Sequence, residues 1–190
     1  MIHILYLASG SGRRFGSNKL LAELRGKPVF RWGLDTLLEV ERSRSDCAVL
    51  VVSRYEEIRN TAQKLGLSAV DSPDSEQGIS HTIRAGLNAL TVNPGDYFLF
   101  AVADQPHISG KTVESLLDEA ENGVLAATAA FGEREGNPAL FSADLLPELL
   151  ALEGDRGGRR VLKNHPGQVR KVQVSEESEL FDVDTPADMK

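Results

Sequence analysis

Short apolar runs alternate with amphipathic helical segments along the first two-thirds of the chain. Continuous runs with little polar alternation are typical of strands that are buried on both faces. Repeated strand–helix–strand units form a mostly parallel sheet with helices on both faces. The sequence therefore predicts an α/β fold, a single-domain three-layer α/β/α sandwich. The expected strands are 2–8, 48–53, 67–70, 97–102 and 124–131, and the expected helices are 29–40, 56–65, 78–90 and 112–121.

The last third of the chain departs from this alternation. A short strand is expected at 137–141 and a helix at 143–152. Residues 169–174 alternate in polarity, which predicts a half-exposed strand. No repeat or linker divides the sequence, and 190 residues suit one well-buried domain. One domain over residues 1–190 is expected.

Composition and charge narrow the possible functions. The formal net charge of −7 argues against a general nucleic-acid binder, which would carry a basic face. No apolar segment approaches membrane-spanning length, and the N-terminal apolar run is too short for a signal peptide, so we expect no membrane partner and a cytoplasmic location. The single cysteine, Cys47, excludes an intramolecular disulfide and is expected in the core.

The first expected strand passes directly into a loop of glycines, serines and cations. Residues 8–19 read Ala-Ser-Gly-Ser-Gly-Arg-Arg-Phe-Gly-Ser-Asn-Lys. Glycines allow successive N–H groups to point at one anion, and Arg13, Arg14 and Lys19 would neutralise that anion. The spacing fits neither a Walker A loop nor the dinucleotide-binding G-x-G-x-x-G. The alternative is a flexible connection after an edge strand, but cations beside glycines favour a triphosphate site.

Two acidic positions are candidates for a metal site. Asp104 directly follows the expected strand at 97–102, and Asp184 lies in an acidic segment near the C-terminus. Ligands of open α/β sheets bind beyond the carboxyl ends of the strands, and Mg²⁺ takes one or two carboxylates together with phosphate oxygens. Asp104 could instead cap the next helix, although Ser109 is available for that role. The alternative for Asp184 is the N-cap of a final helix that begins at Pro186.

Seven short motifs occur in the same order along this sequence as in a known protein family. They are residues 7–21, 26–28, 77–80, 103–106, 136–141, 154–159 and 182–186. Together they cover nearly the whole chain. They resemble the nucleotidyltransferases with a Rossmann-like, GT-A-type sheet, and most closely the molybdenum cofactor cytidylyltransferases of the MobA-like NTP transferase group. The resemblance implies one MobA-like NTP transferase domain with a sheet of the nucleotide-diphospho-sugar transferase type.

The resemblance also implies roles for individual residues. Lys19, Arg13 and Asp104 would be the catalytic residues, and Asp104 and Asp184 would hold Mg²⁺. The implied nucleotide-binding residues are Ala8, Ser9, Gly10, Ser11, Gly12, Arg13, Lys19, Gln77, Gly78 and Ser80. The implied acceptor-binding residues are Gln105, Asn137, Pro138, Asp155 and Arg159.

The reaction that the resemblance implies is transfer of CMP from CTP to the phosphate of molybdopterin or molybdenum cofactor, with release of pyrophosphate. The triplets at 104–106 and 19–21 favour CTP over GTP. One alternative is a nucleotidyltransferase that uses GTP or another acceptor. A second alternative is a carrier that binds molybdenum cofactor and delivers it to a client molybdoenzyme.

Overall fold

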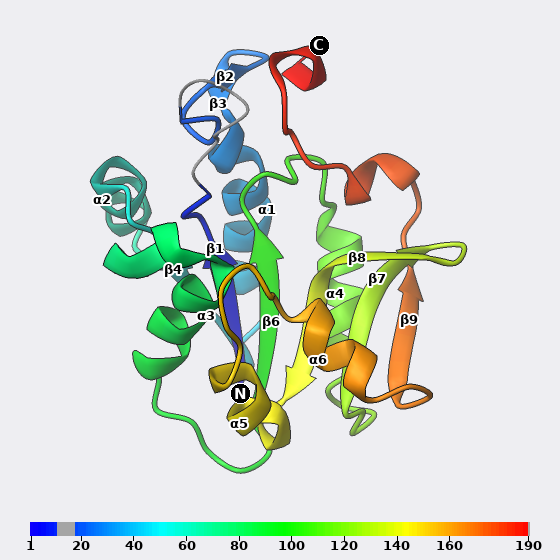
Figure 1. The fold of residues 1–190 in the computed structure, drawn as a ribbon. Helices are drawn as coiled ribbons and strands as arrows, with labels where there is room; N and C mark the ends of the chain where they lie inside the picture. Colours follow the sequence, from blue (N-terminus) through cyan, green and yellow to red (C-terminus); the bar gives the residue numbers. More distant parts are fainter. Residues whose placement is uncertain (11–17, 190) are drawn as a thin grey trace.

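The computed structural model describes residues 1–10 and 18–189 (Figure 1). These residues form a seven-stranded sheet in the order β5-β4-β1-β6-β8-β7-β9 and a small β2–β3 hairpin. The strands are β1 (Ile2–Leu7), β2 (Glu23–Leu24), β3 (Lys27–Pro28), β4 (Cys47–Val52), β5 (Ser68–Val70), β6 (Tyr97–Val102), β7 (Ala126–Phe131), β8 (Arg134–Ser142) and β9 (Val169–Gln173). The helices are α1 (Val29–Ser43), α2 (Glu56–Lys64), α3 (Ile79–Asn88), α4 (Gly110–Asp118), α5 (Leu146–Leu150) and α6 (Arg159–Asn164). Short 3₁₀ helices are η1 (Pro73–Gln77), η2 (Ala143–Leu145), η3 (Glu177–Leu180) and η4 (Pro186–Met189).

The central strand β1 explains why the apolar runs are continuous. Its residues alternate between two cores. Ile4 and Tyr6 pack into the core that contains α1, α2 and α4, whereas Leu5 and Leu7 pack into the core that contains α3, α5 and α6. Helices therefore cover both faces of the sheet (Figure 1). The predicted three-layer α/β/α sandwich is confirmed.

The sheet is mostly parallel, as expected, with one strand that runs the other way. β8 is antiparallel to β6 and β7, whereas β1 is parallel to β4 and β6, and β7 is parallel to β9. β8 is also longer than the strand expected at 137–141. It follows β7 through a tight turn, where Gly132 has a φ of 58°, so β8 must return alongside β7 and separates that strand from β6.

The helix expected over 143–152 is divided into η2 and α5. Pro147 lies in the first turn of α5, where the missing N–H of proline costs no hydrogen bond. The chain therefore begins a new helical segment there instead of continuing the turn of η2.

Residues 174–189, called here the C-terminal segment, cross the carboxyl edge of the sheet after β9 and reach the β2–β3 hairpin (Figure 1). Glu179 is 4% exposed and anchors this segment, since its carboxylate accepts hydrogen bonds from the N–H of Ser109 (3.0 Å) and the hydroxyl of Thr112 (2.7 Å). A second anchor is the N–H of Val183, which donates to the carbonyl of Asp104 at 2.8 Å. These contacts bring the end of the chain to the loop that follows β6.

Two further expectations concern single features. Cys47 is buried at the start of β4, as expected, and burial raises the pKa of its thiol to about 11, which keeps the thiol protonated at neutral pH. Among the described helices, none combines the length and the apolar character that crossing a membrane would need.

Candidate active site

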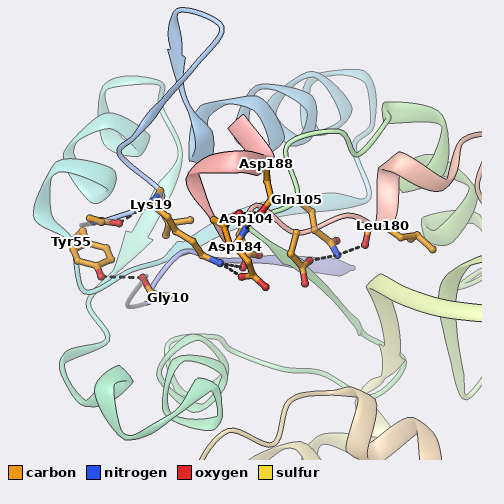
Figure 2. Close-up of polar contacts among 12 residues, drawn as sticks. Gly10, Lys19, Tyr55, Asp104, Gln105, Leu180, Asp184 and Asp188 are labelled. Atoms are coloured by element: carbon orange, nitrogen blue, oxygen red, sulfur yellow. Dashed lines mark hydrogen bonds and ion pairs between the residues drawn. The ribbon is translucent and has the colours of Figure 1, made fainter. Parts of the chain in front are cut away.

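Three charged side chains meet at the carboxyl edge of the sheet (Figure 2). The ammonium Nζ of Lys19 donates to a carboxylate oxygen of Asp104 at 2.8 Å and to one of Asp184 at 2.9 Å. Lys19 is only 6% exposed, although lysine is almost never buried unless it is paired. We call this group the Lys19–Asp104–Asp184 triad.

The parallel pairing of β1 with β6 fixes where Asp104 lies. The strands run in register, from Ile2 opposite Tyr97 to Leu7 opposite Val102. Ala103 continues the ladder through its N–H, which donates to the carbonyl of Leu7 at 3.1 Å. Both strands therefore end at the same edge of the sheet. Asp104, which follows β6, lies beside the start of the loop that follows β1.

Asp184 is held by a turn at the end of the C-terminal segment. The carboxylate of Asp188 accepts hydrogen bonds from the N–H of Asp184 (3.1 Å) and from the N–H (2.7 Å) and hydroxyl (2.8 Å) of Thr185. Asp188 thus satisfies the turn from which η4 begins, and the carboxylate of Asp184 contacts Lys19. The alternative in which Asp184 caps the final helix is wrong. The alternative in which Asp104 caps the next helix is also wrong. Ser109 caps α4, because its side chain accepts from the N–H of Thr112.

The surroundings keep Lys19 positively charged. Burial alone would lower the pKa of the Lys19 ammonium, but the charge of Asp104 and hydrogen bonds to both carboxylates outweigh burial and raise it. The carboxyl of Asp182 lies nearby, and burial, followed by the negative charge of Asp104, raises its pKa against the opposing hydrogen bond from Gln105. One ammonium therefore contacts two carboxylates and has a third carboxyl group nearby, an excess of acid that favours an additional cation.

The donor set fits a magnesium ion that is shared with a nucleotide. Both carboxylates of the triad approach one nitrogen within hydrogen-bond distance, so a single cation could contact both. Over 1–10 and 18–189, no cluster of three or more His, Cys, Asp or Glu side chains could hold a metal by itself. Mg²⁺ commonly takes one or two carboxylates and completes its shell with phosphate oxygens and water.

A cavity of about 510 Å³ opens beside the triad, which lines part of its wall. Its other walls come from the end of β1, from η1 and from the start of α3. The implied nucleotide-binding residues in this wall are Ser9, Gly10, Lys19, Gln77 and Gly78. The volume is within the range of small-molecule sites. We call it the first cavity.

Two of the implied nucleotide-binding residues do not line the first cavity. Ala8 is fully buried, its N–H donates to the carbonyl of Val52 at 2.8 Å, and its carbonyl accepts from the hydroxyl of Ser53 at 2.6 Å. Ser80 is 1% exposed, and its hydroxyl has no hydrogen-bond partner among the described residues. Both backbone groups of Ala8 are therefore occupied by β4 and the residue that follows it.

Three of the implied residues, Ser11, Gly12 and Arg13, lie outside the described residues, as does the rest of 11–17. Their roles stay predictions. The structure describes the first glycine of the loop, whose carbonyl accepts a hydrogen bond from the hydroxyl of Tyr55 at 3.0 Å (Figure 2).

Sequence reasoning missed part of the first cavity. Ser75, Glu76 and Thr82 line it but were not among the implied residues. The hydroxyl of Ser75 is buried without a hydrogen-bond partner in the part of the chain that the structure describes, which is unusual unless a ligand or water completes it. The signal was available, because the loop that carries Ser75 follows β5, and β5 ends at the same edge as the other parallel strands.

The implied acceptor-binding residues are divided between two places. A second cavity, of about 570 Å³, has Gln105, Asn137 and Arg159 in its wall, together with Thr128, Arg134 and Asp182. Asp155 lines the first cavity instead, and Pro138 lines neither.

Gln105 has a clear structural contact in addition to its place in the second cavity. Its side-chain amide donates to the carboxylate of Asp182 at 2.8 Å and to the carbonyl of Leu180 at 3.4 Å (Figure 2). It therefore ties the C-terminal segment to the loop after β6. The loop after β6 and the C-terminal segment each contribute to both cavities. Asp104 and Asp184 line the first cavity, whereas Gln105 and Asp182 line the second.

The structure is an α/β sandwich with a buried charged triad at the carboxyl edge of its sheet, and comparison with known families identifies the class of protein. Residues 4–169 match the MobA-like NTP transferase domain. The chain belongs to the MobA-like NTP transferase family, and its activity is of the nucleotidyltransferase type.

Individual relatives agree on the family but bear different names. The chain is 30% identical to the purine catabolism protein PucB of Bacillus subtilis, over 96% of this chain and 91% of that protein. It is 28% identical to the nicotine blue oxidoreductase of Paenarthrobacter nicotinovorans, over 96% and 92% of the two chains. A similar fold occurs in a Mycobacterium tuberculosis protein solved as a complex with manganese, with a TM-score of 0.77, 21% identity and coverage of 98% and 95%.

We predict that Gly78→Ala destabilises the site more than a matched change elsewhere. Gly78 has a φ of 125°, and a Cβ there would overlap the backbone of Gly154 and Asp155. The control is Gly95→Ala, which also has a positive φ (85°) but has no atom within 4 Å of an added Cβ. Positive φ should cost Gly95→Ala about 1–2 kcal/mol of unfolding free energy. Gly78, with φ 125° and ψ 166°, lies in a region that is essentially restricted to glycine, so its backbone strain should cost about 1–3 kcal/mol and the overlap roughly 1–3 kcal/mol more. Denaturant unfolding measures the difference, and equal losses would contradict it.

Proposed function

We propose that this chain transfers the CMP group of CTP to a phosphate of molybdopterin or molybdenum cofactor and releases pyrophosphate. The observation that carries the proposal is the Lys19–Asp104–Asp184 triad in the wall of the first cavity. A buried ammonium between two carboxylates, next to the start of a glycine loop, suits a ligand that brings both negative charge and a divalent cation.

The first cavity is assigned to the nucleotide. The triphosphate would lie near Lys19 and the glycine loop, with Arg13 as a further cation. Lysine provides a compact point charge, whereas the arginine fork can bind two phosphate oxygens. The ribose and the base would then extend toward the segment from Ser75 to Gly78, which lines another part of the wall.

The second cavity is assigned to the acceptor. It shares the segments of Asp104 and Asp184 with the first cavity, so a phosphate group bound there could approach the α-phosphate of a nucleotide. Two cations line it. Arg134 is paired with Glu177 at 3.1 Å, and Arg159 has no ion-pair partner among the residues described. Arg159 is therefore the side chain that we assign to the acceptor phosphate.

The proposed reaction is an in-line displacement at phosphorus. An oxygen of the acceptor phosphate attacks the α-phosphorus of CTP and forms a new P–O bond, while the bond from that phosphorus to the bridging oxygen breaks and pyrophosphate leaves. The attacking phosphate is already ionised at neutral pH, so no dedicated base is needed. Lys19 would contribute by alignment and charge neutralisation.

Mg²⁺ is the proposed cofactor, with Asp104 and Asp184 as its protein ligands. When bound, it would offset the negative charge that builds up on the triphosphate and on departing pyrophosphate. The manganese complex of the Mycobacterium tuberculosis protein supports a divalent cation in this fold.

Two alternatives remain for the finer activity. A nucleotidyltransferase of this family could use GTP or an acceptor other than the pterin, and the different names of its relatives are consistent with varied substrates. A carrier of molybdenum cofactor for a client molybdoenzyme would bind the pterin without CTP or Mg²⁺. A buried triad of opposite charges is unnecessary for a carrier, which favours the enzyme.

We expect pyrophosphate release with CTP, Mg²⁺ and molybdopterin together, at a rate at least about tenfold above that with ATP, GTP or UTP. The measurement is a coupled pyrophosphate assay over the four nucleotides, with and without acceptor. Preference for GTP would support the guanylyl alternative. Binding of the pterin without pyrophosphate release from any nucleotide would contradict the proposed transferase activity and support the carrier alternative.

Arg159→Ala should weaken the acceptor site while leaving the nucleotide site intact. Loss of one charge-assisted hydrogen bond to phosphate should raise the KM for molybdopterin roughly 10- to 100-fold, with the KM for CTP unchanged. The matched control is Arg160→Ala, which removes the next, exposed arginine of α6 and is outside the second cavity. A rise in the KM for CTP, or the same effect in both variants, would remove Arg159 from the acceptor site.

A further inference from the structure

The position of Lys19 poses a problem for the metal site of the proposed function. Its ammonium lies within 2.8 and 2.9 Å of the two carboxylates that would hold the divalent cation. Its nitrogen therefore occupies the place where a cation shared by Asp104 and Asp184 would sit. Two cations so close together would repel each other, and each carboxylate oxygen would have to serve both.

We propose that Lys19 holds the metal site closed until a polyphosphate arrives, so that the divalent cation enters with the nucleotide rather than before it. The inference rests on the proposed function, since the cation and the nucleotide both come from it. It adds an order of binding and a second role for Lys19. In this role Lys19 is a positioning residue that controls access to Asp104 and Asp184.

Burial and charge explain why the closed arrangement is stable without a ligand. Lys19 is 6% exposed, so its ammonium has few water molecules to replace a lost carboxylate. Removing one partner from a buried ion pair leaves an uncompensated charge, which is strongly unfavourable. A divalent cation alone offers no anion to receive the ammonium. It must therefore displace Lys19 at that cost.

A triphosphate changes this balance. Its oxygens can accept the ammonium of Lys19, since the first cavity begins at the same side chain. The two carboxylates are then free for the cation, and the same triphosphate supplies the remaining oxygen ligands that this part of the chain lacks. Binding of the cation and binding of the nucleotide should each favour the other.

The charges that flank the triad also explain why a metal can replace Lys19. The carboxylate of Asp182 adjoins the triad, since it accepts from the side-chain amide of Gln105, the residue after Asp104, at 2.8 Å. One ammonium does not neutralise the carboxyl groups of Asp104, Asp182 and Asp184. A divalent cation would neutralise them more fully, with the ammonium of Lys19 then paired with the phosphates. In the protein without ligand, the ammonium of Lys19 thus reduces the repulsion between the carboxylates of Asp104 and Asp184.

The test is Mn²⁺ binding without any nucleotide, measured by titration calorimetry and by the EPR signal of free Mn²⁺. Lys19→Met removes the ammonium and keeps an unbranched side chain. We expect it to bind Mn²⁺ at least about tenfold more tightly than the wild-type protein, because no cation has to be displaced. Adding Asp104→Asn to Lys19→Met should abolish the gain, since one of the two carboxylates is then lost.

The matched control is Lys27→Met. Lys27 also forms a 2.8 Å ion pair, with Asp35, but lies outside both cavities. The Lys27→Met variant should bind Mn²⁺ with the same affinity as the wild-type protein. Lys19→Gln is the second variant if Lys19→Met does not fold, and the same gain is expected because the amide carries no charge. Lys19→Arg keeps the charge and should show no gain.

Equal Mn²⁺ affinity in the wild-type protein and the uncharged Lys19 variants would overturn the inference, as would a gain that persists with Asp104→Asn. These outcomes are separate from the proposed function, which is judged by pyrophosphate release from CTP. A protein that lacks cytidylyltransferase activity could still show the gain. An active enzyme without the gain would keep the function and lose the closed metal site.

Discussion

The ion pairs of one lysine organise this molecule at its functional edge. Lys19 contacts carboxylates that lie 85 and 165 residues away along the sequence. A buried ammonium is costly unless it is paired, and two close carboxylates repel each other unless a cation lies between them. Each charge is therefore acceptable only because the others are present. The proposed metal site and the proposed order of binding both depend on this mutual requirement.

The fold supplies that arrangement through three segments. Pairing of β1 with β6 places Asp104 at the carboxyl edge of the sheet, directly after the end of β6. Lys19 lies in the turn before β2, where the carbonyl of the next residue, Leu20, accepts from the N–H of Phe30 in α1 at 3.1 Å. Asp184 needs the C-terminal segment, which crosses the sheet edge and is held by Glu179 and by the N–H of Val183. The sheet thus positions one charge and the turn before β2 another. The third is positioned by the C-terminal segment, which is held by polar contacts and by the buried side chains of Val174, Leu180 and Val183.

Sequence reasoning was strongest where local chemistry decides the structure. Continuous apolar runs predicted the buried strands, and Ser109 was recognised as a helix cap. The rule that ligands bind beyond the carboxyl ends of parallel strands led to Asp104. The same rule applied to β5 would have found Ser75, which lies in the loop after that strand.

What could not be predicted depends on distant parts of the chain. The insertion of β8 between β6 and β7 follows from strand pairing that no local pattern records. It contributes to the division of the expected acceptor residues, with Asn137 in the second cavity and Asp155 in the first. The role of Asp188, whose carboxylate accepts from the N–H groups of Asp184 and Thr185, was not predicted either, because it depends on how the C-terminal segment turns.

The most direct test of the central claim is a crystal structure of the protein with Mn²⁺ and a non-hydrolysable CTP analogue, with manganese located by anomalous scattering. The account predicts manganese between Asp104 and Asp184, with the ammonium of Lys19 moved onto the phosphates in the first cavity. Manganese bound elsewhere, with both ion pairs of Lys19 intact and the analogue away from the triad, would contradict it.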